Sequence, residues 1–528
     1  MLSELKIQAT NDELVLPPRD LVANPNTQTN PRRLHSWLDD MPVANPPAMA
    51  SMTLKSISLL NRHPEAVPRR AQLLRCYFPV VQHLLSFIRD NAEHPGIPGN
   101  PQMPAGLREA VEKIVSEMAL GYKQVSMEER HSVFRKNAKQ QQAETLYHAI
   151  KYLALEMVFA FSDYRRPPDH NLREILHLFA FAQAMNLAEE PVVDGTDSLG
   201  LKTNIADAVT LILLLILLDP FHLGPGETWQ AYNYLVHRSS RATLEFGGER
   251  EISKGLFIVD QAGTGKPVPY DDHSTGMGFS DDLLLDASRL NAKVNQHLQL
   301  MKTDRKSDLE EIRGLNASNP IAARQMLQHM LLAWHIVPKR RHSREKRQAQ
   351  LTAVCGIASI HLMLSGGTPK PGGVGMDLHL WKQTNISAGG IEVSAPLADQ
   401  EHLRVGELVL LQGERGERDL TMKLGIVRHL SQLEDGTLGA GIQFIFGRVF
   451  PVTIQPSGQS GNLKLNTHPS LLVERGDNYP GNLFTPRHVY RSKRDYSVQS
   501  DSGTNLAVHS GNLLEASRNF ERFEFSRS

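Results

Sequence analysis

The chain has 528 residues, which is enough for three or four domains. Its 57 Lys and Arg residues balance 57 Asp and Glu residues, so the formal net charge is zero. This balance argues against a protein that coats nucleic acid or anionic lipid through bulk positive charge. A hydrophobic content of 41% and a charged content of 22% are typical of globular proteins and argue against wholesale disorder.

The first 45 residues are polar and rich in Pro and Asn, and they lack the apolar stretch of a signal peptide. We expect residues 1–45 to form a disordered tail. The two cysteines, Cys76 and Cys355, cannot build a disulfide framework or a four-thiolate metal site, and we expect them to be buried free thiols. These observations favour a cytoplasmic protein.

Residues 46–334 are dominated by a helical period, and we predict a helical bundle or an irregular helical solenoid there. Pro79 should kink or divide the helix predicted over 69–90. The most apolar run, Ala208–Leu218, is shorter than the ~20 residues that a membrane span requires, so it predicts a buried core helix. The helices are predicted at 51–62, 69–90, 107–118, 131–164, 172–186, 204–218, 227–246, 282–301 and from Pro320.

The pattern changes near residue 335, and after residue 348 it predicts strands. Short apolar stretches separated by Gly-rich or charged turns indicate a small sandwich or barrel over 335–450. Residues 451–528 continue this pattern with fewer large apolar residues, which predicts a C-terminal β-rich module packed on the first. The strands are predicted at 351–363, 378–384, 391–395, 405–412, 420–429 and 437–446.

No stretch of the sequence assembles a catalytic or metal site. Ala262–Lys266 resembles a phosphate-binding loop, but Asp260 stands where the first glycine is needed and Pro267 follows the lysine. No nucleophile is paired with a base, and no histidine or cysteine cluster has ligand spacing. We therefore predict a protein that is not an enzyme and has neither a metal nor a cofactor.

Two short segments carry most of the information about function. Lys339–Arg347 reads KRRHSREKR, in which six of nine residues are basic and one is acidic. Arginine can bond to guanine edges, stack on a purine and pair with phosphate. The second segment, Asn385–Gly390, reads NISAGG and lies between two predicted strands, where its donors and glycines can approach an anion or a base. Together they predict one site for a guanine nucleotide.

At these residues the sequence resembles the PilZ family of bacterial cyclic di-GMP receptors. The family pattern RxxxR matches Arg340 and Arg344, and [D/N]xSxxG matches Asn385, Ser387 and Gly390. The resemblance covers roughly 335–450 and implies a six-stranded barrel, so the overall fold is multidomain, α then β. Asn385 follows Arg344 by 41 positions, which is longer than usual in the family.

The resemblance implies cyclic di-GMP as the ligand. Arg340 and Arg344 would grip guanine edges and phosphates, and Arg341 and Arg347 could share or replace these roles. Asn385 and Ser387 would bond the ligand, while Gly389 and Gly390 let the backbone approach it. Ordering of the arginine segment would then alter the interdomain arrangement or binding of a protein partner by the helical half.

Two other functions remain open. One is a scaffold or interaction protein whose PilZ-like barrel is degenerate and binds no ligand. The other is a nucleic-acid-binding protein that uses the basic clusters 339–347 and 487–494, which we favour less because only Tyr490 and Tyr496 interleave the second cluster.

Overall fold

The computed structural model divides into two compact units, which we describe separately. The helical unit comprises Met1–Pro220 and Gly226–Pro338, and the barrel unit comprises Phe221–Pro225 and Lys339–Ser528. The structure describes residues 14–527 except 19, 21, 94–102, 130–137, 195–199, 248–252, 271–282, 302–311, 313, 316–319, 336–342, 368–376, 414–421, 458–466, 475–480 and 501–502.

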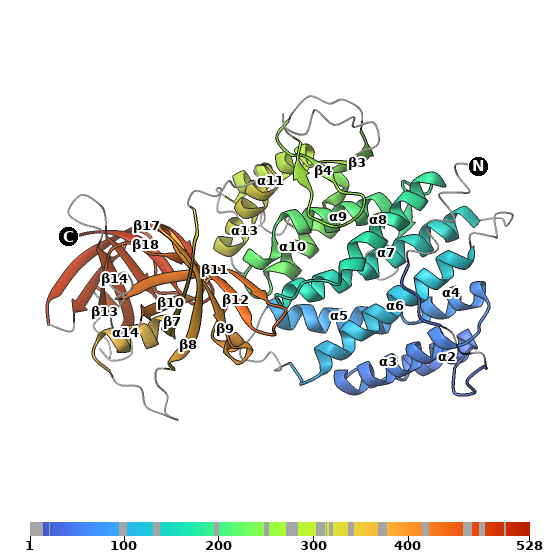
Figure 1. The fold of residues 1–528 in the computed structure, drawn as a ribbon, viewed down its shortest axis with the longest axis horizontal. Coiled ribbons are helices and arrows are strands. Elements are labelled where there is room, and N and C mark those ends of the chain that lie inside the picture. Colours follow the sequence, from blue (N-terminus) through green and yellow to red (C-terminus); the bar gives the residue numbers. More distant parts are fainter. Residues whose placement is uncertain are drawn as a thin grey trace. The chain divides into compact units, whose positions relative to one another are not determined.

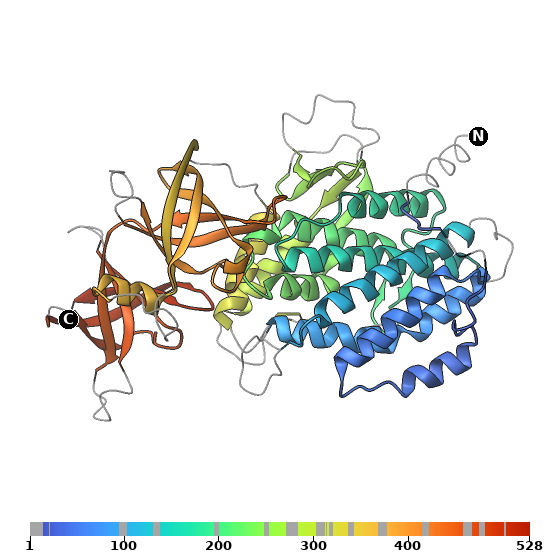
Figure 2. The ribbon, with the colours of Figure 1, turned by 60° about the horizontal axis from the view of Figure 1, so that its bottom comes forward.

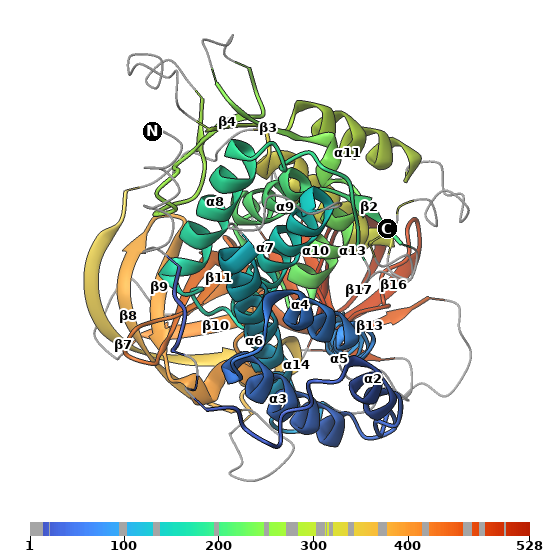
Figure 3. The same ribbon diagram turned by 90° about the vertical axis from the view of Figure 1, so that its right-hand side faces the viewer.

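The helical unit is built around two long helices, α6 and α7, which lie side by side (Figures 1 and 3). α9 packs against α7 and is buried along almost its whole length, as predicted for this apolar run. Among the described residues no helix is both long and apolar enough to cross a membrane. The helices are α2 (Pro31–Asp39), α3 (Pro46–Arg62), α4 (Val67–Cys76), α5 (Phe78–Glu93), α6 (Leu107–Glu129), α7 (Ala138–Ser162), α8 (Asp169–Ala184), α9 (Ile205–Leu217), α10 (Glu227–Val236), α11 (Ser288–Leu300) and α13 (Pro320–Ala333), with a short 3-10 helix at Ser239–Arg241 (η2). A second 3-10 helix, η1 (Pro220–His222), includes the last residue of the first segment of the helical unit and the first two residues of the barrel unit.

Local sequence explains where several helices begin. Asn30 and Asn45 each accept hydrogen bonds from backbone amides of the first turn, and a proline follows each of them. Pro79 lies in the first turn of α5, so the predicted helix 69–90 is divided at Tyr77 rather than kinked in its interior.

The prediction for the first 45 residues is wrong in part. Residues 1–13 lie outside the described residues, but Pro31–Asp39 form α2, whose Leu34 and Leu38 are buried. Hydrophobic burial of these leucines therefore orders a segment whose composition indicates disorder.

The all-helical prediction for 46–334 is also incomplete. The end of the predicted helix 227–246 and the start of 282–301 are strands of a four-stranded antiparallel sheet, in the order β3-β6-β4-β5 (Figure 2). A two-stranded sheet, β1-β2, precedes α9. The strands are β1 (Val192–Val193), β2 (Lys202–Thr203), β3 (Thr243–Phe246), β4 (Leu256–Val259), β5 (Val268–Pro269) and β6 (Leu283–Asp286).

The barrel unit contains two closed barrels of six antiparallel strands each. Both have the same strand order around the barrel: first, second, third, sixth, fifth and fourth in sequence. The first consists of β7 (Glu345–Cys355), β8 (His379–Ser387), β9 (Gly390–Ala395), β10 (Leu408–Gly413), β11 (Lys423–Gln432) and β12 (Leu438–Phe444). The second consists of β13 (Arg448–Pro456), β14 (His468–Glu474), β15 (Asn482–Thr485), β16 (Asp495–Ser500), β17 (Asn505–Ala516) and β18 (Glu521–Arg527).

One part of the strand prediction is wrong. The run predicted as one strand over 351–363 turns at Gly356, which has a φ of +85°, and continues as α14 (Ile357–Leu364). Ile357 and Ile360 of α14 join a buried cluster that contains residues of both barrels, including Leu410 and Phe484. Packing against the second barrel thus favours a helix over the strand that the β-branched residues predict.

Candidate functional site

The basic segment ends where the first strand of the first barrel begins. Arg340 and Arg341 lie outside the described residues. Arg344 directly precedes β7, and its side chain is 45% exposed. Arg347 lies within β7 and is half-buried. Arg344 is therefore the member of the RxxxR pattern whose surroundings the structure describes.

The second motif forms the tight turn between β8 and β9. Ser387 ends β8, and its Oγ donates a hydrogen bond to the carbonyl oxygen of Gly390, 3.2 Å away. A Cβ atom at Gly390 would lie 2.4 Å from the carbonyl oxygen of Ile442, so this position has no room for a side chain. The carbonyl oxygen of Gly389 accepts a hydrogen bond from the backbone amide of Phe444. Both glycines are thus held against β12.

Strand pairing brings the two motifs to the same end of the barrel. β7 and β8 are antiparallel, with Glu345 opposite Ile386 and Lys346 opposite Asn385. The residue that precedes β7 therefore lies next to the end of β8. Sequence separation of 41 positions between Arg344 and Asn385 does not prevent this, because most of the intervening chain forms β7, α14 and β8 themselves.

Glu392, which belongs to neither motif, connects the two of them. Its Oε2 accepts a hydrogen bond from Arg344 Nη1 at 2.7 Å and another from Asn385 Nδ2. Asn385 and Glu392 are directly opposite in the β8–β9 pair. The only signal in the sequence is that Glu392 comes two positions after Gly390, on a strand whose register depends on the turn.

The arrangement suits an anionic, acceptor-rich ligand. Arg344, Lys346 and Asn385 supply donors at one end of the barrel, and Glu392 is the acidic side chain that engages two of these groups. A phosphate or guanine edge could replace the Glu392 carboxylate as the acceptor. Among the described residues, no three His, Cys, Asp or Glu side chains lie close enough together to hold a metal ion.

Comparisons with known proteins match most of the chain to one kind of receptor. The model of the N-terminal domain of the cyclic-di-GMP receptor FimW matches residues 32–250, and the model of its middle PilZ domain matches residues 256–370. These two ranges together cover more than half of the chain. The second range includes the basic segment, β7 and α14, but ends before the Asn385–Gly390 turn.

A curated relative agrees with these matches. The cyclic-di-GMP receptor FimW of Pseudomonas aeruginosa is 24% identical over 342 residues, which cover 64% of this chain and 54% of that protein. The chain thus aligns with about half the length of this relative. Among solved structures, the insecticidal delta-endotoxin Cry8Ea1 of Bacillus thuringiensis aligns with this chain at 6% sequence identity. The alignment covers 99% of this chain and 72% of the endotoxin chain. Its TM-score of 0.16 is too low to support any argument.

Proposed function

We propose that this chain, which belongs to the PilZ family of cyclic-di-GMP receptors with an N-terminal region, binds cyclic di-GMP at the end of its first barrel. The observation that carries the proposal is the juxtaposition of Arg344 with the Asn385–Gly390 turn, mediated by Glu392. The chain acts in this proposal as a cytoplasmic receptor and effector, not as an enzyme.

Each site residue has a role that its chemistry supports. Arg340, Arg341 and Arg344 pair with phosphates or guanine edges, with Arg347 as a further contributor. Asn385 and Ser387 hydrogen-bond the ligand, and Gly389 and Gly390 admit its close approach to the backbone. The ligand replaces Glu392 as the partner of Arg344 and Asn385, and in doing so it draws the arginine segment against the barrel.

Isothermal titration calorimetry of the full chain with cyclic di-GMP tests the proposal. We expect binding by the wild-type protein and a loss of tenfold or more in affinity for Arg344→Ala and for Ser387→Ala. Arg404→Ala is the matched control, because it removes an exposed arginine from another part of the same barrel. Folded wild-type protein that releases no heat would instead favour a scaffold with a degenerate barrel.

The output of binding is a second step of the proposal. Ordering of the segment before β7 changes the arrangement of the helical unit relative to the barrel unit, or exposes a surface of the helical unit to a protein partner. Small-angle scattering with and without saturating ligand measures the first possibility, and an unchanged profile would rule it out.

Binding of DNA or RNA with a steep salt dependence, lost on changing either 339–347 or 487–494, would support the nucleic-acid function instead.

A further inference from the structure

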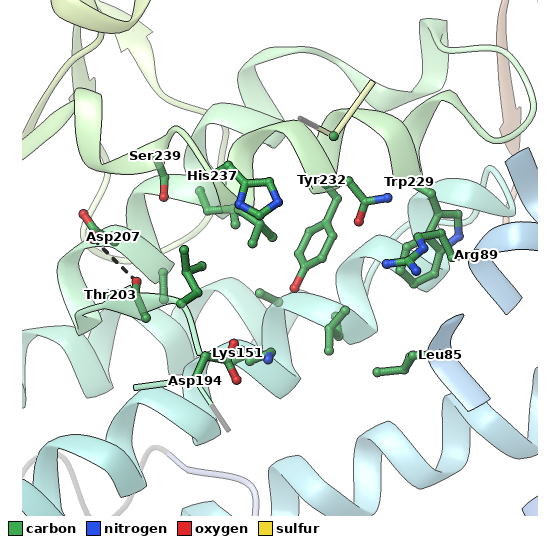
Figure 4. Close-up of a pocket in the computed structure, with 18 of the residues that line it drawn as sticks. Leu85, Arg89, Lys151, Asp194, Thr203, Asp207, Trp229, Tyr232, His237 and Ser239 are labelled. Carbon is green, nitrogen blue, oxygen red and sulfur yellow. Dashed lines mark hydrogen bonds and ion pairs between the residues drawn. The ribbon is translucent and has the colours of Figure 1, made fainter. Parts of the chain in front are cut away.

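The helical unit contains a cavity of about 390 Å³. It lies among α5, α7, α9 and α10, and residues at the β1–β2 pair, in the segment that follows α10 and at Gly314 also line it (Figure 4). Its volume falls within the range of sites that bind small molecules. All of its lining residues belong to the helical unit, so it is separate from the site proposed on the first barrel.

One wall of the cavity carries a hydrogen-bond donor that lacks an acceptor. The side chain of Tyr232 extends into the cavity in Figure 4, and the residue is only 8% exposed. Its hydroxyl makes no hydrogen bond with the described residues. On the same helix, Trp229 is 2% exposed, and its indole Nε1 is buried without a partner among the described residues. An acceptor bound in the cavity can therefore pair with the Tyr232 hydroxyl.

Arg89 of α5 also lines the cavity and adds a positive charge to it (Figure 4). Within the described part of the chain its guanidinium contacts only Asp90 and Ser86, each at 3.4 Å, and its side chain is 37% exposed. These contacts are too long to be strong hydrogen bonds. A guanidinium fork can therefore receive a carboxylate or a phosphate from the cavity.

Neither of the acidic residues that line the cavity, Asp194 and Asp207, is paired with Arg89. Asp194 Oδ2 accepts hydrogen bonds from Lys151 Nζ at 2.5 Å and from the Tyr147 hydroxyl at 2.9 Å, so this carboxylate is already neutralised. Asp207 lies beside Thr203, on the opposite side of the cavity from Arg89 in Figure 4. Burial, together with the charge of Glu189, raises the pKa of Asp207 to about 6. The cavity is therefore cationic at the Arg89 side.

We propose that this cavity binds a small organic anion, with its carboxylate or phosphate group at Arg89 and Tyr232. The aromatic rings of Trp229, Tyr232 and Tyr147 require an apolar or aromatic body next to the anionic group. The helical unit thereby has a ligand of its own, whose binding does not depend on the nucleotide proposed for the first barrel.

Thermal unfolding of the full chain with a panel of probe pairs tests this inference. Each pair consists of an aromatic carboxylate and its neutral amide, such as 4-hydroxybenzoate and 4-hydroxybenzamide, or of a phosphate monoester and its parent alcohol. We expect at least one anion to raise the unfolding midpoint of the helical unit while its neutral partner does not. Calorimetry of that anion then gives its affinity for wild-type protein and variants.

Three variants test whether the anion binds in the cavity or elsewhere on the protein. Arg89→Gln should lower the affinity for the anion at least tenfold, and Tyr232→Phe should lower it about threefold. Arg69→Gln, which removes an exposed arginine of α4, should leave this affinity unchanged. Equal binding of an anion and its neutral partner, or equal loss in Arg69→Gln, overturns the inference. A panel in which no anion shifts the midpoint at 10 mM overturns it as well.

Discussion

Replacing Glu392 with glutamine tests whether this carboxylate competes with the nucleotide for the barrel site. In the structure Glu392 Oε2 accepts hydrogen bonds from both Arg344 and Asn385, which are the residues we assign to the ligand. A bound phosphate must break these contacts and then lies near a like charge. The variant Glu392→Gln removes the charge with little change in side-chain shape, so we expect it to bind cyclic di-GMP more tightly.

The size of the effect follows from the exposure of the pair. The side chains of Arg344 and Glu392 are 45% and 33% exposed, so the ion pair contributes about 0.2–1 kcal/mol. Relief of repulsion between the carboxylate and the phosphate adds a similar amount at a separation of roughly 6 Å in a mostly aqueous medium. The sum is about 1 kcal/mol, which corresponds to a dissociation constant roughly fivefold lower.

Calorimetry at about 0.15 M and 1 M salt measures this gain, which should shrink at high salt because both contributions are screened. Glu401→Gln is the control, since it removes the same charge from an exposed position between β9 and β10. Weaker binding by Glu392→Gln would refute the reasoning, because the carboxylate would then be a ligand contact. An affinity equal to wild type would refute it too.

Two further predictions concern the stability of each unit. Burial lowers the pKa of His148 to about 3, whereas the same histidine in the unfolded chain has a pKa near 6.5. The free energy of unfolding therefore has its full value above pH 6.5 and falls as the pH drops from 6.5 toward 3, by about 2 kcal/mol at pH 5. Urea unfolding followed by circular dichroism should show this loss reduced in His148→Leu but not in His83→Leu, which changes an exposed histidine; an unchanged pH slope in the first variant would contradict the assignment. Phe484 of the second barrel is fully buried in the cluster shared with the first, so Phe484→Ala should cost about 3–5 kcal/mol. Amide hydrogen exchange in Phe484→Ala should then also be faster in β10 and β11 of the first barrel, whereas the control Leu514→Ala, which changes an exposed residue, should leave it unchanged. If exchange in β10 and β11 of Phe484→Ala stays as slow as in the wild type, the two barrels unfold independently.

Elements with a strong local pattern could be predicted from the sequence. The apolar run of α9 and the short strands β8 to β12 lie within a few residues of their predicted positions. The sheet β3–β6 could not be predicted, because its strands have at most four residues and Thr243 pairs with Asp286 far along the chain. Leu471 and Leu472 illustrate a second reason: they are adjacent, yet one faces the first barrel and the other the core of the second. Burial on both faces removes the alternation that indicates a strand.

The candidate site was only partly predictable for a related reason. Arg344 and Asn385 belong to short motifs that can be found by their spacing. Glu392 has no motif, and its contact with both residues depends on the register of β8 with β9. Side-chain pairing across strands is a property of this register, which one residue of slippage would abolish.

The shared strand order of the two barrels raises the question of whether the second also has a nucleotide site. In the first barrel the site lies where the first strand begins and the second turns into the third. The second barrel begins at Arg448, only four positions after β12 ends at Phe444, so the chain has no space for a basic segment there. Its basic cluster 487–494 joins the third strand to the fourth, and because all pairs are antiparallel, this connection lies at the end opposite the start of β13. The common fold therefore carries the arginine segment and the Asn385–Gly390 turn only on the first barrel, and the second barrel contributes packing to it through Leu471, Val473 and Phe484.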